Sequence, residues 1–84
     1  MSDDEIMAKV TEILQDIFEN PDMSVTPETT AVMVPGWDST AQIKLLLAVE
    51  EEFSIHFSAR EMDQLRHVGD LIAAISRQLG PTQK

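Results

Sequence analysis

Helical spacing of apolar residues is the feature that most restricts how this chain can fold. In three segments, apolar side chains recur every three or four positions, which is the spacing of one face of a helix. They are Ile6, Val10, Ile13, Leu14, Ile17 and Phe18, then Leu45, Leu46, Val49 and Phe53, and finally Val68, Leu71, Ile72, Ile75 and Leu79. Only residues 53–57 alternate with a period of two, and no second such segment offers them a pairing partner. The pattern predicts an all-α fold.

Capping residues predict where these helices begin. Ser2 with Glu5, and Ser58 with Glu61, form capping boxes, while Asp38 is a good N-cap. The predicted elements are a first helix over residues 3–19, a loop over 20–37, a second helix over 39–53, a short helix over 59–65 and a last helix over 68–79, which Gly80 caps and Pro81 ends. The sum is a small bundle of three main helices plus one short helix, in a single domain over residues 1–84.

The loop over residues 20–37 is long for so small a domain, and such loops are usually functional or packed. Three prolines and Gly36 interrupt any helical period. We expect the loop to pack onto the core through Val25, Val32, Met33 and Val34. Thr26-Pro27-Glu28 is a candidate start for a single helical turn, because proline is favoured at the first helical position.

Composition excludes several classes of protein. With 84 residues there is room for one domain, and without cysteine there are no disulfides, thiolate zinc sites or cysteine nucleophiles. The net charge of −9 disfavours binding to the phosphates of DNA or RNA. No stretch approaches the roughly 18 apolar residues of a membrane span, and the acidic start does not resemble a secretory signal. We expect a cytoplasmic monomer that binds neither nucleic acid nor membrane.

The second helix is unusually apolar. Seven of the nine residues from 41 to 49 are apolar, and they form more than one stripe. A domain of this size cannot readily bury a helix on all sides, so part of this surface could face a partner or a ligand. The alternative is that the helix is simply the central helix of the core.

Residues for conventional catalysis are few. His56 and His67 do not form a recognisable metal motif, and there is neither an EF-hand loop nor a nucleophile elbow. We expect no metal site and no enzyme activity. A small hydrolase that uses Ser39 stays open as the weakest of the functional readings.

Ser39 is the residue that stands out. The sequence Gly36-Trp37-Asp38-Ser39 places its hydroxyl in the first turn of the expected second helix. Free backbone N–H groups and the positive end of the helix dipole lie there, and both favour a phosphate on that oxygen. Serines at helix starts are also common as simple caps, so this physics alone leaves both roles open.

The residues around Ser39 resemble the acyl carrier protein family. Asp38-Ser39-Thr40 is similar to the family's Asp-Ser-Leu motif, and Ala48-Val49-Glu50-Glu51-Glu52-Phe53 is similar to its acidic second helix. Ile55-His56-Phe57-Ser58, Val68-Gly69-Asp70-Leu71 and Val25-Thr26-Pro27-Glu28 extend the resemblance over most of the chain. It implies a carrier of acyl thioesters, whose thiol belongs to 4′-phosphopantetheine attached to Ser39, with Asp38 as motif residue and helix cap. No cysteine is then needed.

The resemblance also implies partners. A phosphopantetheinyl transferase would install the arm from coenzyme A with Mg²⁺, and a ligase, synthase or acyltransferase would load and use it. The spacing along the second helix predicts a partner-facing stripe beside Ser39. Its residues are Thr40, Lys44, Leu47, Ala48 and Glu51, with Leu45, Leu46, Val49 and Phe53 facing the core.

Three positions depart from the family pattern, namely Trp37, Thr40 and Lys44. They favour a dedicated pathway over the housekeeping fatty-acid carrier, within fatty-acid, polyketide or specialised acyl biosynthesis. Two alternatives are an aminoacyl or peptidyl carrier of the same fold, and an unmodified acidic adaptor that binds a protein through the second helix. Met7, Met23, Met33 and Met62 are either an adaptable lining for a long cargo or ordinary core and loop residues.

Overall fold

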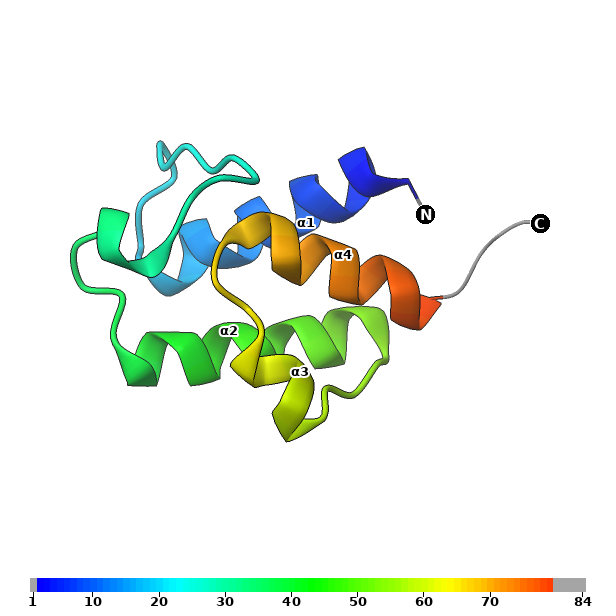
Figure 1. Ribbon diagram of the computed structural model, residues 1–84. Helices are drawn as coiled ribbons and strands as arrows, with labels where there is room; N and C mark the ends of the chain where they lie inside the picture. The colour runs from blue at the N-terminus through cyan, green and yellow to red at the C-terminus, as the bar shows by residue number, and fades with distance from the viewer. Residues whose placement is uncertain (1, 80–84) are drawn as a thin grey trace.

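The computed structural model describes residues 2–79, which form a bundle of helices (Figure 1). The elements are α1 (Asp3–Ile17), the 3₁₀ helix η1 (Ala31–Met33), α2 (Ser39–Phe53), α3 (Ala59–Asp63) and α4 (Val68–Leu79). The predicted all-α bundle of three main helices and one short helix is confirmed. The bounds of α2 and α4 coincide with the expected ranges, whereas the expected caps Gly80 and Pro81 lie outside the described residues.

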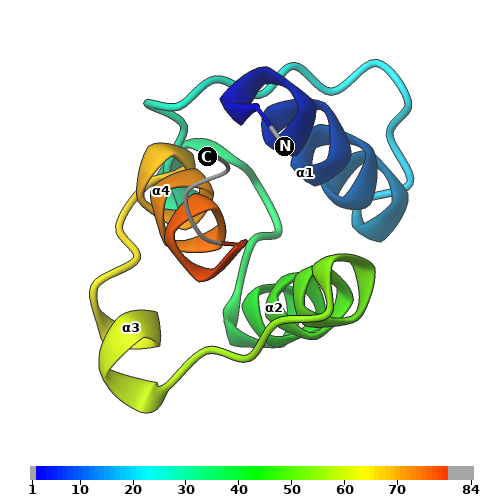
Figure 2. The same cartoon turned by 90° about the vertical axis from the view of Figure 1, so that its right-hand side faces the viewer.

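The three long helices enclose one core. Figure 2 looks nearly along α1, α2 and α4, with α3 set beside α2 and α4 at the edge of the bundle. The core side chains come from all three helices and from the segment after α2. They are Ile6, Val10 and Leu14 of α1, Leu45, Leu46, Val49 and Phe53 of α2, Phe57, and Val68, Leu71, Ile72, Ala74 and Ile75 of α4. These positions include most of the apolar residues whose helical spacing predicted the fold.

Helix α1 ends two residues earlier than the predicted residue 19. The N–H of Glu19 donates to the carbonyl of Asp16 at 3.2 Å, and the N–H of Asn20 donates to that of Gln15 at 2.9 Å. Glu19 has a φ of 51°, so the chain leaves the helix through a left-handed residue. The predicted stop at Asn20-Pro21 was therefore slightly late, because this closing turn precedes the proline.

The short helix is also shorter than predicted. Helix α3 ends at Asp63 rather than residue 65, and the next residues continue as turns, with the N–H of Leu65 donating to the carbonyl of Met62 at 3.2 Å. The connection before it was expected to be extended over residues 53–57, but Phe53 is the last residue of α2 and Ser54 is left-handed, with a φ of 55°. The expected burial is found, with Phe53 and Phe57 buried and Ile55 half-buried. The carboxylate of Glu50 accepts the N–H of Phe57 at 2.8 Å and holds this connection against α2.

The expectation that the long loop packs through four apolar residues is wrong for two of them. Val32 is 95% exposed and Met33 is 64% exposed, while Val25 and Val34 are partly buried. Val32 and Met33 belong to η1, whose single turn lies on the surface and directs them outward. The segment from Thr26 forms a turn rather than a helix, closed by the N–H of Thr29 donating to the carbonyl of Thr26 at 3.0 Å.

The same loop is fastened to the start of α4. The N–H of Val68 donates to the carbonyl of Thr29 at 2.8 Å, and the N–H of Gly69 donates to that of Pro27 at 2.7 Å. A Cβ at position 69 would lie 3.0 Å from the Pro27 oxygen, which is tighter than an ordinary contact, so the close approach favours glycine. The loop thereby supplies acceptors to a helix end that would otherwise lack them.

Candidate functional site

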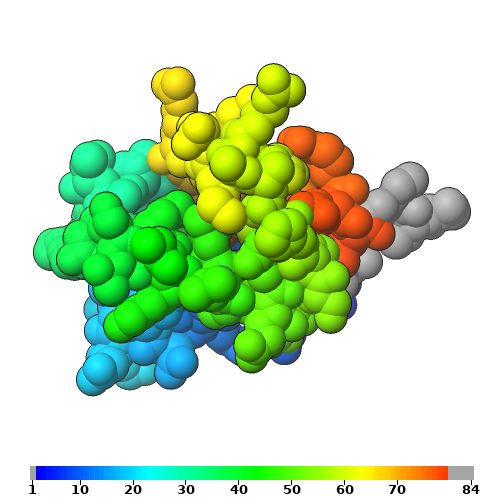
Figure 3. Space-filling model, turned by 90° about the horizontal axis from the view of Figure 1, so that it is seen from below, coloured from blue at the N-terminus to red at the C-terminus, as the bar shows by residue number. Residues whose placement is uncertain are grey.

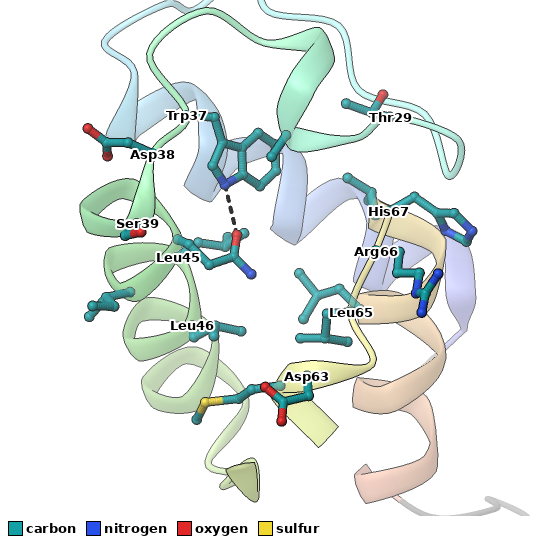
Figure 4. Close-up of a pocket in the computed structure, with 16 residues that line it drawn as sticks. Thr29, Trp37, Asp38, Ser39, Leu45, Leu46, Asp63, Leu65, Arg66 and His67 are labelled. Atoms are coloured by element: carbon teal, nitrogen blue, oxygen red, sulfur yellow. Dashed lines mark hydrogen bonds between the residues drawn. The ribbon is translucent and has the colours of Figure 1, made fainter. Parts of the chain in front are cut away.

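Ser39 is the first residue of α2, and its side chain is exposed. Just before it, Gly36 adopts a φ of +88°, which a residue with a side chain rarely does, and this turn brings the chain to Asp38. Asp38 is the N-cap, with its Oδ1 accepting the N–H of Ala41 at 3.0 Å. Figure 4 shows Asp38 and Ser39 together at this end of α2. The structure thus presents the serine hydroxyl to solvent on a capped helix end.

The electrostatic surroundings of Ser39 suit an anion. Within residues 2–79, the N–H groups of Ser39 and Thr40 donate to no acceptor, and the first turn of α2 carries no acidic residue. Unpaired N–H groups and the aligned peptide dipoles give a helix N-terminus a partial positive charge. A phosphate oxygen near Ser39 would therefore be stabilised.

A cavity of about 680 Å³ opens beside Ser39 (Figure 4). Its lining comes from the end of the long loop, from α2 and α3, and from the start of α4. The lining residues are Thr29, Ala31, Trp37, Asp38, Ser39, Gln42, Ile43, Leu45, Leu46, Met62, Asp63, Leu65, Arg66, His67, Val68 and Leu71. The wall is mostly apolar, with polar residues near Ser39 and at the opposite rim. Such a cavity can receive part of a chain attached to the serine.

Trp37 joins the loop to the site, and the sequence alone did not indicate how. Its indole N–H donates to Oε1 of Gln42 at 2.8 Å, and its ring lies 5.8 Å from the Phe18 ring, centroid to centroid. One side chain therefore connects the end of α1, the loop and the first turns of α2. In the sequence, the one hint of this contact is Gln42, a polar residue one helical turn after Ser39 that can accept the indole N–H.

The predicted partner-facing stripe is exposed, apart from Ala48, which is partly buried. Leu47 is 60% exposed and Ile43, one turn before it, is 58% exposed, so two large apolar side chains lie together on this surface. The four residues predicted to face the core from α2 are all buried. Figure 3 shows α2 and α3 side by side in the middle of one face of the molecule, in green and yellow-green.

The two histidines lie apart from Ser39. His56 Nδ1 is 3.2 Å from a carboxylate oxygen of Glu50, and His67 Nδ1 is 3.5 Å from one of Asp70. No group of three potential metal ligands is found within residues 2–79. The backbone N–H of Arg66, and then that of His67, donate to Asp70, and these bonds hold the pKa of its carboxyl below the ordinary aspartate value.

Of the four methionines considered as a cargo lining, Met62 alone lines the cavity. Met7 and Met23 pack against the core, and Met33 is exposed on η1. Met7, Met23 and Met33 therefore do not line this cavity, and their positions fit the other reading, that of ordinary core and loop residues. None of the helices within residues 2–79 combines the length and apolar character needed to span a membrane.

Comparison with known proteins identifies the family. Residues 8–75 match the family described as the phosphopantetheine attachment site. The chain is 32% identical to an acyl carrier protein of Akkermansia muciniphila over 80 residues, which cover 95% of this chain and all of that one. A shorter match, 38% identical over 53 residues, covers 63% of this chain and 47% of a mitochondrial relative from Schizosaccharomyces pombe.

Comparison of the fold with solved structures points to the same family. The solution structure of the holo acyl carrier protein from Geobacter metallireducens superposes with a TM-score of 0.81 at 29% identity, covering 86% of this chain and 83% of that one. The prosthetic group that these likenesses indicate is phosphopantetheine, and proteins of this kind are carriers rather than catalysts. The resemblance noted from the sequence is confirmed: the chain belongs to the acyl carrier protein family.

Proposed function

We propose that Ser39 carries the phosphopantetheine arm and that Asp38 holds the helix end that presents it. The observation that supports this most is the exposed hydroxyl of Ser39 at the start of α2, within the matched residues 8–75. The unpaired N–H groups of Ser39 and Thr40 in the described chain fit the oxygens of a phosphodiester. The adjoining cavity offers space to what the arm carries.

The attachment is a phosphoryl transfer in which Ser39 is the acceptor. Its Oγ forms a bond to the phosphorus that bears the pantetheine in coenzyme A, and the bond from that phosphorus to the bridging oxygen breaks. Adenosine 3′,5′-bisphosphate leaves with the bridging oxygen, and the serine proton passes to a base of the transferase. The transferase also holds the Mg²⁺, so this chain needs no metal ligands of its own.

The cargo we propose is an acyl thioester, used in a dedicated fatty-acid, polyketide or specialised pathway. A transferase and an acyl ligase, synthase or acyltransferase are the partners that this role requires. An aminoacyl or peptidyl cargo is the alternative that the fold also suits. A cytoplasmic location and a monomeric state stay predictions from the sequence.

The partner surface that we propose is the stripe of Thr40, Lys44, Leu47, Ala48 and Glu51. Leu47 supplies an exposed apolar anchor, Lys44 places a cation on the stripe, and Glu51 is its one acidic residue. A dedicated partner with an acid opposite Lys44 would be recognised, while a partner with a base there would be repelled.

Replacing Lys44 with Glu tests this surface. We expect slower transfer with the pathway's own enzyme and faster transfer with a generic fatty-acid synthase enzyme, more so at low salt, because surface charge acts mainly on association rate. Lys9→Glu makes the same change of charge on α1, outside the stripe, where Lys9 Nζ lies 3.7 Å from a carboxylate oxygen of Glu52. As the control, it should leave the preference between the two enzymes unchanged. Equal rates for the Lys44 variant and the native chain with both enzymes would contradict the assignment.

Intact mass tests the attachment itself. The unmodified chain is incubated with coenzyme A, Mg²⁺ and a broad-specificity transferase. We expect one phosphopantetheinyl group per native chain and none on Ser39→Ala. Ser24→Ala, at an exposed serine in the long loop, is the matched control and should be modified like the native chain. An unmodified native chain, or a modified Ser39→Ala that melts like the native protein, would overturn the proposal.

A further inference from the structure

Gln42 brings a fixed hydrogen-bond donor to the cavity wall. It lies one helical turn after Ser39 and lines the cavity. Its Oε1 accepts the indole N–H of Trp37 at 2.8 Å. Because an indole N–H only donates, the amide oxygen must face Trp37, and the NH₂ group must be directed elsewhere. The contact with Trp37 therefore sets the orientation of the whole amide.

The NH₂ group of Gln42 has no protein acceptor in the described chain. Among the sixteen lining residues drawn in Figure 4, the bond between Trp37 and Gln42 is the one that is marked. The nearest part of the wall on α2 is apolar, from Leu45 and Leu46. Two N–H donors beside an apolar wall favour a ligand that brings an acceptor with it.

The other polar groups of the cavity are engaged or lie at the far rim. Asp38 caps α2, the Thr29 hydroxyl accepts the N–H of Thr26 at 3.0 Å, and His67 contacts Asp70. Asp63 ends α3, Arg66 lies in the segment between α3 and α4, and both are exposed. Gln42 is thus the donor that is both held in place and close to the serine.

We propose that the NH₂ group of Gln42 donates a hydrogen bond to a neutral oxygen, a carbonyl or a hydroxyl, on the arm or on its cargo. This deepens the proposed function and rests on it. Gln42 lies between Ser39 and the pair Leu45 and Leu46 along α2, so an arm that follows α2 from Ser39 into the cavity passes Gln42 first. The site suits a chain that is oxygenated near Gln42 and apolar beyond it, and Trp37 is the positioning residue that aims the donor.

Two substitutions separate donation from packing. Gln42→Glu keeps an oxygen that can accept from Trp37 but removes both amide donors, and Gln42→Met keeps the length without either function. Gln64→Glu makes the same change of charge at an exposed residue that follows α3 and does not line this cavity. Fluorescence of Trp37, the single tryptophan of the chain, reports whether its surroundings persist.

The experiment compares four forms of the protein by NMR, each checked by intact mass. They are the unmodified chain, the arm-bearing form with a free thiol, a saturated acyl form, and a 3-oxoacyl form of equal chain length. We expect the side-chain amide protons of Gln42, assigned by their loss in Gln42→Glu, to move downfield. The first form to show this shift identifies the acceptor as an arm amide carbonyl, the thioester carbonyl or the 3-oxo group.

Melting temperature provides a second readout. Loading with the form that shifts Gln42 should raise the melting temperature of the native chain and of Gln64→Glu, and raise it less in Gln42→Glu and Gln42→Met. Unmoved Gln42 signals in all modified forms, or an equal rise in every variant, would overturn the proposal for Gln42 alone. A mass that shows no arm on the native chain would instead overturn the attachment at Ser39, and the Gln42 proposal with it.

Discussion

The first turns of α2 and α4 both border the cavity, but they differ in whether their first backbone N–H groups find acceptors. At α4, the N–H groups of Val68 and Gly69 donate to loop carbonyls. Asp70 accepts two more N–H groups from the residues just before the helix, at 3.0 and 3.3 Å. At α2, Asp38 binds Ala41, and the first two N–H groups meet no acceptor in the described chain.

This difference distinguishes a helix end whose N–H groups are bonded within the protein from one whose N–H groups are open, as the proposed attachment at Ser39 requires. The long loop covers the start of α4, and its carbonyl oxygens already accept the N–H groups that give this helix end its positive potential. The start of α2 is open to solvent, and its potential stays available to an anion beside Ser39. A second phosphate site at α4 is therefore not expected, even though both helix ends face the same cavity.

The largest predicted effect comes from forcing the loop away from α4. Gly69→Val should lower the free energy of unfolding by about 1–3 kcal/mol, since its added atoms overlap the Pro27 carbonyl, which a Cβ alone would approach to 3.0 Å. Chemical denaturation measures this. Ala73→Val places a valine at an exposed position of the same helix without the overlap and should cost well under half as much, since valine is a weaker helix former than alanine but not than glycine. Equal losses would mean that the loop contact is unimportant.

Removing the cap of α2 should have a smaller effect. Asp38→Ala should lower the free energy of unfolding by about 1 kcal/mol, the usual contribution of an N-cap, while Asp38→Ser should recover most of it. Denaturation curves of the three proteins give the comparison. If Asp38→Ala were as stable as the native chain, the bond to Ala41 would contribute nothing, and α2 would be held by its packing alone.

The smallest effect concerns pH at the start of α4. Hydrogen bonds from the backbone of Arg66 and His67 lower the pKa of Asp70 in the folded state, so its stabilising contribution is present above the pKa of an unfolded aspartate. It is lost as pH falls through the lowered folded-state pKa. The stability difference between the native chain and Asp70→Asn should therefore narrow at acidic pH.

Melting temperatures of both proteins between neutral and acidic pH test this prediction. The comparison uses the difference between the two proteins because they share all their other carboxylates. A difference that stays constant down to acidic pH would show that the charge of Asp70 does not contribute to holding the start of α4.

The contrast between local and long-range signals explains what the sequence could predict. The start of α2 follows from Asp38 and the apolar spacing after it, which are local features. The early end of α1 depends on Glu19 in a left-handed conformation, without the glycine that usually marks it. Val32 and Met33 were misplaced because the exposure of a loop residue depends on where the whole loop docks.

The contacts that shape the cavity were beyond sequence analysis for the same reason. The clamp between the loop and α4 joins backbone groups of Pro27 and Gly69, which carry no side-chain signature. The contact of Trp37 with Gln42 requires the turn at Gly36 to fold the indole back over α2. Ser39, in contrast, could be singled out because its motif and its helix start lie within a few residues.

The most direct test of the account locates the arm at residue level. The native chain, modified with coenzyme A and a transferase, is digested, and its peptides are fragmented by mass spectrometry. The open start of α2 predicts a single phosphopantetheinyl group, bound to the side chain of Ser39. An arm found on Thr40, on Ser24 or at the start of α4 would contradict the claim that the open helix end at Ser39 is the attachment site.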